Sequence, residues 1–116
     1  MYDQEKRELK THKPFLIKFF APWCAHCQAL SPIWDQLYVE YSDSFNILKV
    51  DCTIEETREL CIQFKVKGYP SILLLKHNHY YKHKGERTID AIVEFASGRY
   101  DEAEVQGRIP PKVPNP

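Results

Sequence analysis

Hydrophobic and polar positions change their period several times along the chain, and these changes predict alternating strands and helices. Near-continuous apolar residues after Pro14 predict a central strand over residues 15–20 that is covered on both faces. Over residues 24–41 apolar side chains recur every three or four positions, which is the spacing of an amphipathic helix. The same patterns predict a strand over residues 45–51 and a helix over residues 55–64.

The second half of the chain predicts a hairpin and a closing helix. A break at Gly68-Tyr69-Pro70 precedes a strand over residues 71–76, and His77-Asn78-His79 predicts a turn into a strand over residues 80–82. Thr88 is a candidate N-cap for a helix that reaches about residue 97. Strand, helix, strand, hairpin and closing helix together predict an α/β sandwich with a mixed sheet.

The two ends of the chain have a different character. Residues 2–12 are polar and helix-prone, which predicts a short helix. Beyond Arg99 the sequence is charged and then rich in proline, so residues 100–116 are expected to form a tail or linker outside the core. We therefore predict one domain over residues 1–99.

Composition narrows the classes of function. The chain has 116 residues with 16 basic and 16 acidic side chains, so its formal net charge is zero. A general binder of nucleic acid or of anionic membranes usually carries a basic excess, and we expect neither partner here. No apolar run has the length of a membrane span, and the first residues lack the hydrophobic core of a signal peptide.

The most informative motif is Trp23-Cys24-Ala25-His26-Cys27, which follows the first predicted strand. Two cysteines three positions apart at a helix start lie on one face, where they can form a disulfide with little backbone movement. The N–H groups and the positive dipole end of the helix favour the thiolate of the first cysteine. This spacing predicts a pair that cycles between dithiol and disulfide.

Other candidate sites have more than one interpretation. Cys52 and Cys61 are either a second disulfide between a strand end and the next helix, or two buried thiols. Because they do not form a second CxxC, a zinc site is disfavoured and no metal is expected. Three histidines surround the predicted hairpin and are interpreted as exposed turn residues; they are His77, His79 and His83.

Three ordered motifs resemble the catalytic thioredoxin-fold domains of the protein disulfide isomerase family. They are Ala21-Pro22-Trp23-Cys24-Ala25-His26-Cys27, Val50-Asp51-Cys52-Thr53 and Gly68-Tyr69-Pro70-Ser71. The resemblance covers about residues 14–96 and implies a three-layer sandwich with a central mixed sheet. His26 between the cysteines points to the isomerase branch, and Val-Asp-Cys-Thr with a later Leu60-Cys61 points to isomerases of the endoplasmic reticulum.

The resemblance also implies roles within the cysteine motif. Cys24 matches the family's nucleophile and Cys27 its resolving cysteine. His26 would donate to the Cys24 thiolate or favour it electrostatically. Trp23 beside them has two interpretations from its position, either a substrate contact or a ring that covers the helix start.

Three further positions match family residues elsewhere in the chain. Pro70 matches a cis-proline beside the active site, and Tyr69 would offer backbone groups to a substrate strand. Arg87 matches an arginine that approaches the resolving cysteine and helps it to ionise.

The chain also departs from the family pattern. The family places a buried acid six residues before the first cysteine as a proton acceptor for the resolving thiol, but Lys18 occupies that position here. Lys49 stands where the family often has the lysine partner of that acid, and Ala25 replaces a usual glycine. The chain has no room for the family's first strand, so we expect the sheet to lack that edge strand.

Together these residues predict a thiol–disulfide oxidoreductase or isomerase of the endoplasmic reticulum lumen that needs no cofactor. Cys24 would attack a substrate disulfide and Cys27 would resolve the mixed disulfide. Expected partners are unfolded or misoxidised proteins and either glutathione or an upstream oxidase. The domain is expected to be monomeric, with a multidomain or membrane-anchored parent left open. Alternative functions are a peptide-binding chaperone or adaptor with poor redox turnover, and a thioredoxin-like reductase.

Overall fold

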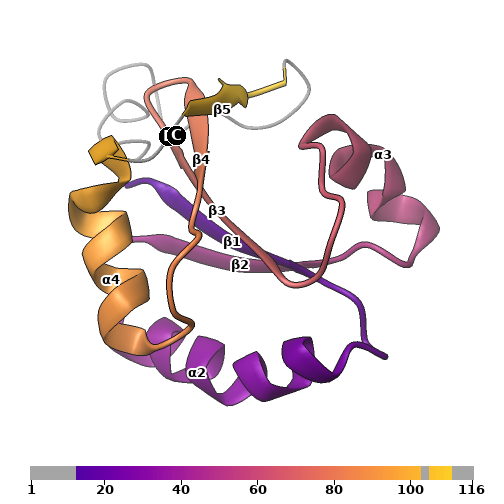
Figure 1. Cartoon of the computed structure of the whole chain (residues 1–116), viewed down its shortest axis with the longest axis horizontal. Helices are drawn as coiled ribbons and strands as arrows, with labels where there is room; N and C mark the ends of the chain where they lie inside the picture. Colours follow the sequence, from indigo (N-terminus) through magenta and orange to yellow (C-terminus); the bar gives the residue numbers. More distant parts are fainter. Residues whose placement is uncertain (1–12, 103–104, 111–116) are drawn as a thin grey trace.

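The protein forms one mixed sheet with helices on both faces (Figure 1). The structure is a computed structural model that describes residues 13–102 and 105–110. The elements in chain order are β1 (Phe15–Phe20), α2 (Ala25–Tyr41), β2 (Asn46–Asp51), α3 (Glu55–Gln63), β3 (Ser71–Lys76), β4 (His79–Lys82), α4 (Ile89–Ser97), the 3₁₀ turn η1 (Arg99–Glu102) and β5 (Val105–Arg108). The helix predicted over residues 2–12 lies outside the described residues.

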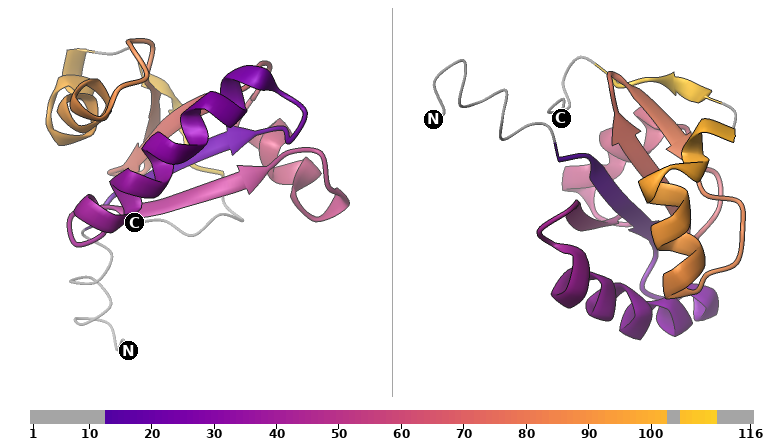
Figure 2. Two further views of the ribbon diagram at one scale, coloured as in Figure 1. Left: turned by 90° about the horizontal axis from the view of Figure 1, so that it is seen from below. Right: turned by 90° about the vertical axis from the view of Figure 1, so that its left-hand side faces the viewer.

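The sheet has the strand order β2-β1-β3-β4-β5. β1 pairs with β2 in parallel and with β3 antiparallel, and the β3–β4 hairpin extends the sheet antiparallel. Helices α2 and α4 cover one face and α3 covers the other, and Figure 2 shows α2 lying across β1 and β2. The predicted three-layer α/β sandwich with a mixed sheet is confirmed.

Side chains of β3 contribute alternately to the two hydrophobic clusters of the core. Ile72 and Leu74 face α2 and α4, whereas Leu73 and Leu75 face α3, because successive side chains of a strand point to opposite faces. All four are buried, so β3 is apolar on both faces from Ile72 to Leu75. This central strand explains why the hydrophobic run lacks the alternation of a strand with one face in solvent.

The predicted helix cap and hairpin turn are both present in the structure. The Thr88 hydroxyl accepts a hydrogen bond from the Ala91 N–H at 3.2 Å and caps α4. His77 and Asn78 have φ values of 55° and 69°, as both central residues of a type I′ hairpin turn require. The turn is two residues long, and His79 already belongs to β4.

The expectation of a non-core tail from residue 100 is wrong for two segments. Tyr100 is buried in the cluster under α4, with its ring centroid 5.1 Å from that of Tyr81. Residues 105–108 form β5, which pairs antiparallel with β4. The pattern did not reveal β5 because backbone hydrogen bonds hold an edge strand without a continuous apolar face. Residues 111–116 of the predicted tail lie outside the described residues.

The other edge of the sheet is β2. Within the described residues no strand precedes β1, so β2 has a single neighbour. Over the same residues no helix has both the length and the apolar character needed to cross a membrane.

Candidate active site

The CxxC motif lies where β1 ends and α2 begins. The Cys24 N–H donates to the Ala21 carbonyl at 3.1 Å, and Cys24 is the N-cap residue of α2. Ala21, Cys24 and Cys27 form a small buried cluster against which Phe20 and Tyr69 pack. The strand therefore delivers both cysteines to the first turn of a helix.

The environment of Cys24 favours its thiolate. Its Sγ accepts a hydrogen bond from the Cys27 N–H at 3.2 Å, and its thiol lies 3.6 Å from the Tyr69 carbonyl oxygen, which accepts from it. The pKa of Cys24 is lowered, first by the hydrogen bond from the Cys27 side chain and then by the N–H groups of Cys27 and His26. These contacts outweigh the opposing effect of burial. Cys24 is 8% exposed, so the residue is buried but keeps a small accessible area.

Cys27 lies behind Cys24 and has the opposite tendency. It is 3% exposed, and burial, followed by the hydrogen bond to Cys24, raises the pKa of its thiol. The Ala21 backbone and the charge of Lys18 act against this rise. The site therefore favours ionisation of Cys24 before that of Cys27, which is the order that nucleophilic attack by Cys24 requires.

A loop distant in sequence completes the site. The Tyr69–Pro70 peptide bond is cis, as the resemblance implies, and Pro70 is buried. Trp23 is 71% exposed and meets the Tyr69 ring edge-on, with centroids 5.8 Å apart. The exposed Trp23 ring and the Tyr69 carbonyl thus both lie beside Cys24.

His26 and Arg87 both contribute to the lowered pKa of Cys24. His26 acts through its backbone N–H, and it lines a hollow of about 190 Å³ together with Arg87. The charge of Arg87 also lowers the pKa of Cys24. The cation that lowers the pKa of Cys27 is Lys18 instead.

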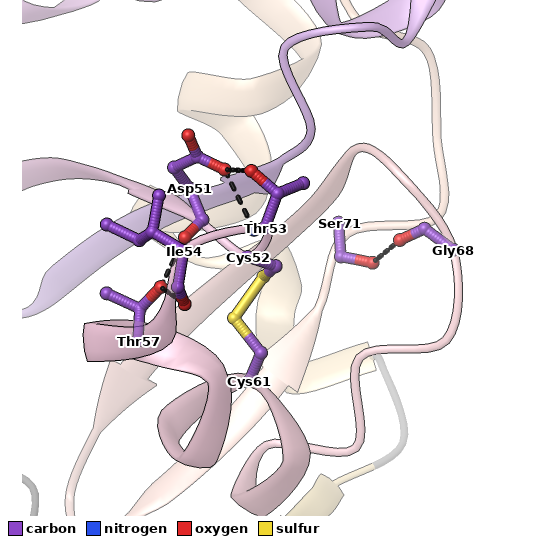
Figure 3. Close-up of a disulfide and its surroundings, with 8 residues drawn as sticks. All are labelled: Asp51, Cys52, Thr53, Ile54, Thr57, Cys61, Gly68 and Ser71. Atoms are coloured by element: carbon purple, nitrogen blue, oxygen red, sulfur yellow. Dashed lines mark hydrogen bonds between the residues drawn. A yellow bond between two sulfur atoms is a disulfide. The ribbon is translucent and has the colours of Figure 1, made fainter.

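The second cysteine pair is a disulfide on the opposite face of the sheet (Figure 3). Cys52 follows β2 and Cys61 lies in α3, with their Cα atoms 6.0 Å apart. Asp51 Oδ1 accepts hydrogen bonds from the Thr53 N–H at 2.9 Å and the Thr53 hydroxyl at 2.7 Å. The Thr57 hydroxyl donates to the Asp51 carbonyl. These hydrogen bonds hold the turn between Cys52 and the first turn of α3.

The hairpin histidines have local partners. His79 Nδ1 is 2.9 Å from the His77 carbonyl oxygen, and His83 Nε2 is 2.7 Å from the Glu86 carbonyl oxygen. Among the described residues no group of three His, Cys, Asp or Glu side chains is arranged to hold a metal ion.

The site and the fold define a thiol–disulfide oxidoreductase class, and comparison with known proteins agrees. The thioredoxin family profile matches residues 2–98, so the chain belongs to the thioredoxin family. It is 44% identical over 83 residues to the thioredoxin domain-containing protein 5 homolog of Drosophila melanogaster, covering 68% of this chain and 20% of that protein. It is 38% identical over 97 residues to human protein disulfide-isomerase TMX3, covering 81% of this chain and 21% of that protein.

A solved structure shows the same fold. The first thioredoxin domain of mouse protein disulfide-isomerase A4 superposes with a TM-score of 0.68 at 25% identity, over 98% of this chain and 81% of that one. Several of the relatives that the chain matches are named protein disulfide-isomerase. The chain spans about a fifth of the length of the curated relatives cited above.

Proposed function

We propose that this domain exchanges disulfides with cysteines of folding proteins through a Cys24–Cys27 dithiol–disulfide cycle. The observation that carries the proposal is the asymmetry of the pair. Cys24 has a lowered pKa and is 8% exposed, whereas Cys27 is 3% exposed and has a raised pKa. Such an arrangement lets one sulfur attack a substrate while the other is held to resolve the intermediate.

In this cycle the Cys24 thiolate attacks a substrate disulfide and forms a mixed disulfide. Cys27 then attacks Cys24 and releases the reduced substrate, and the reverse sequence oxidises a substrate dithiol. Trp23 and Tyr69 would hold an unfolded segment beside Cys24, because one offers an exposed apolar ring and the other a backbone carbonyl.

The Cys52–Cys61 disulfide and the relatives support a place in the secretory pathway, and we propose the endoplasmic reticulum lumen. A structural disulfide persists in an oxidising compartment and is rare in the cytosol. Named relatives include protein disulfide-isomerases several times longer than the matched segment. The proposal therefore includes a multidomain parent, protein substrates and re-oxidation by glutathione or an upstream oxidase.

The test is the reduction potential of the Cys24–Cys27 couple, measured by thiol alkylation in glutathione buffers of graded poise. We expect a value nearer to about −180 mV, as in protein disulfide isomerase, than to about −270 mV, as in thioredoxin. A value at the thioredoxin end would make the domain a reductase. A pair that does not follow the buffer poise would contradict redox function and favour a peptide-binding chaperone or adaptor.

A further inference from the structure

Lys18 is a buried cation beside the resolving cysteine. It lies in the central strand β1, in register with Lys49 of β2 and Ile72 of β3, and it is 3% exposed. A buried ammonium normally requires an anionic partner. Among the described residues no carboxylate forms a salt bridge with Lys18; its Nζ lies 5.1 Å from the Phe20 ring centroid and 5.9 Å from the Trp34 ring.

The Lys18 side chain shares a cavity with Cys27. This cavity has a volume of about 360 Å³, and its wall includes Lys18, Cys27, Ser31 and Lys49. It is large enough for water molecules, which could carry a proton between the buried groups and solvent. Lys18 and Cys27 therefore border the same water-sized space.

The charges around this cavity act on both groups. Burial lowers the pKa of Lys18, and Lys49 lowers it further, whereas Asp35 and Cys27 raise it. In return the charge of Lys18 lowers the pKa of Cys27.

Two protonation states of the Lys18–Cys27 pair carry no net charge. One is a neutral amine beside a thiol, and the other is an ammonium beside a thiolate. Moving the proton from sulfur to nitrogen exchanges these states without adding net charge to a buried site. Ionising Cys27 alone would place an uncompensated thiolate there, which burial opposes.

We propose that Lys18 accepts the proton of the Cys27 thiol as Cys27 resolves the mixed disulfide, an inference that rests on the proposed exchange function. The S–H bond of Cys27 breaks and an N–H bond forms at Lys18 Nζ. The Cys27 sulfur bonds to the Cys24 sulfur while the bond between Cys24 and the substrate sulfur breaks. The substrate sulfur leaves with the electron pair, so the substrate is reduced as Cys24 and Cys27 are oxidised. Lys18 then returns its proton to water in the cavity.

The test separates the two chemical steps. Reduced protein is mixed with a peptide disulfide, the reaction is quenched with acid, and mixed-disulfide and oxidised forms are counted by mass spectrometry across pH. Lys18→Met keeps the length of the side chain without the amine, and Lys18→Arg keeps the charge without a neutral state. We expect both variants to slow resolution by about a hundredfold, the lower end of the contribution of a positioned base.

The control variant is Lys84→Met, which removes an exposed cation that does not line the cavity, and it should change resolution by less than about threefold. The rate of Cys24 alkylation should stay within about twofold of the unmodified protein in all variants. An unmodified protein whose Cys24 does not react would instead contradict the proposed function. Unchanged resolution in Lys18→Met would overturn the role of Lys18. Restoration by Lys18→Arg would also overturn it, because the charge alone would then suffice.

If a variant fails to fold, a measurement on the unmodified chain still tests whether Lys18 can accept a proton. Nitrogen-15 NMR of lysine Nζ in the reduced protein follows the titration of Lys18 directly. We expect Lys18 to lose its proton below the ordinary range of lysine, so that a neutral amine exists at the working pH. A Lys18 signal that stays that of an ammonium up to about pH 10 would overturn the proposal, since no lone pair would be available.

Discussion

The two cysteine pairs of this domain have the same chemical groups but different surroundings. Cys24 and Cys27 are free thiols, three positions apart, in the first turn of α2. Cys52 and Cys61 are bonded, nine positions apart, and connect the end of β2 to α3. The first pair meets backbone N–H groups and nearby cations, whereas the second packs in the apolar cluster beneath α3.

The difference shows that helix position decides what a cysteine pair can do. The N–H groups of a first turn have no partner within the helix and can bond to a sulfur, which stabilises a thiolate. Cys61 lies inside α3, where the N–H groups are already used by the helix. The first pair is thus suited to exchange and the second to holding a strand end against a helix.

The sharpest test of this contrast is the loss of either sulfur of the first pair. Cys24→Ser should reduce disulfide exchange to the uncatalysed rate, because the attacking thiolate is absent. Cys27→Ser should still attack and should accumulate mixed disulfides that nothing resolves. Non-reducing gels with a peptide disulfide distinguish the two. Equal residual activity in both variants would contradict the assigned order.

Removing the second pair should affect stability instead. The double variant Cys52→Ala/Cys61→Ala loses a cross-link over a short loop, and the free energy of unfolding should fall by about 2–3 kcal/mol. Urea denaturation followed by circular dichroism measures this change. Alkylation of Cys24 under folding conditions should stay within about twofold. A proportional loss of Cys24 reactivity would show that the two pairs are not independent.

The pH dependence of Cys24 tests the charges near the first pair. Because its pKa is lowered, the thiolate persists below the pH at which an ordinary thiol becomes protonated, and alkylation should remain fast there. Arg87→Met should move the midpoint upward and slow alkylation at pH 7 a few-fold, since Arg87 is the weakest of the favourable contacts. The matched control is Lys84→Met, which removes an exposed cation of the same loop. This variant should leave the pH dependence of Cys24 alkylation unchanged.

The smallest expected effect concerns the turn that carries Cys52. Asp51→Ala removes the acceptor of two hydrogen bonds from Thr53 and should cost about 1 kcal/mol of unfolding free energy. Asp51→Asn keeps an acceptor oxygen and should lose less. Thermal unfolding of both variants gives the comparison, and a Cys24 alkylation rate altered by Asp51→Ala would argue against the separation of the two pairs.

Much of the fold could be predicted because its signals are local. The apolar run of β1, the three- and four-residue spacing of α2 and the Thr88 cap each depend on neighbouring residues. The CxxC motif is local as well, since a helix start and a three-residue spacing place both sulfurs together.

The remaining features depend on contacts between distant segments. The Tyr69 carbonyl reaches Cys24 across 45 positions, and no spacing rule predicts that contact. Tyr100 is an isolated aromatic residue whose burial depends on Tyr81 and on Lys76, whose Nζ lies 4.9 Å from its ring. Lys18 was visible as a charge inside an apolar strand, but its cavity with Cys27 arises only when α2 packs on β1.

The two edge strands of the sheet, β2 and β5, differ in how well they could pair with a further strand. β5 has four residues, its pairing with β4 contains a register shift at Tyr80 and Tyr81, and Ile109 and Pro110 follow it directly. Short, irregular and proline-flanked edges are poor templates for another strand. β2 is longer and regular in its pairing, with Leu48 exposed. Among the strands that the structure describes, β2 is therefore the better edge for pairing with a further strand.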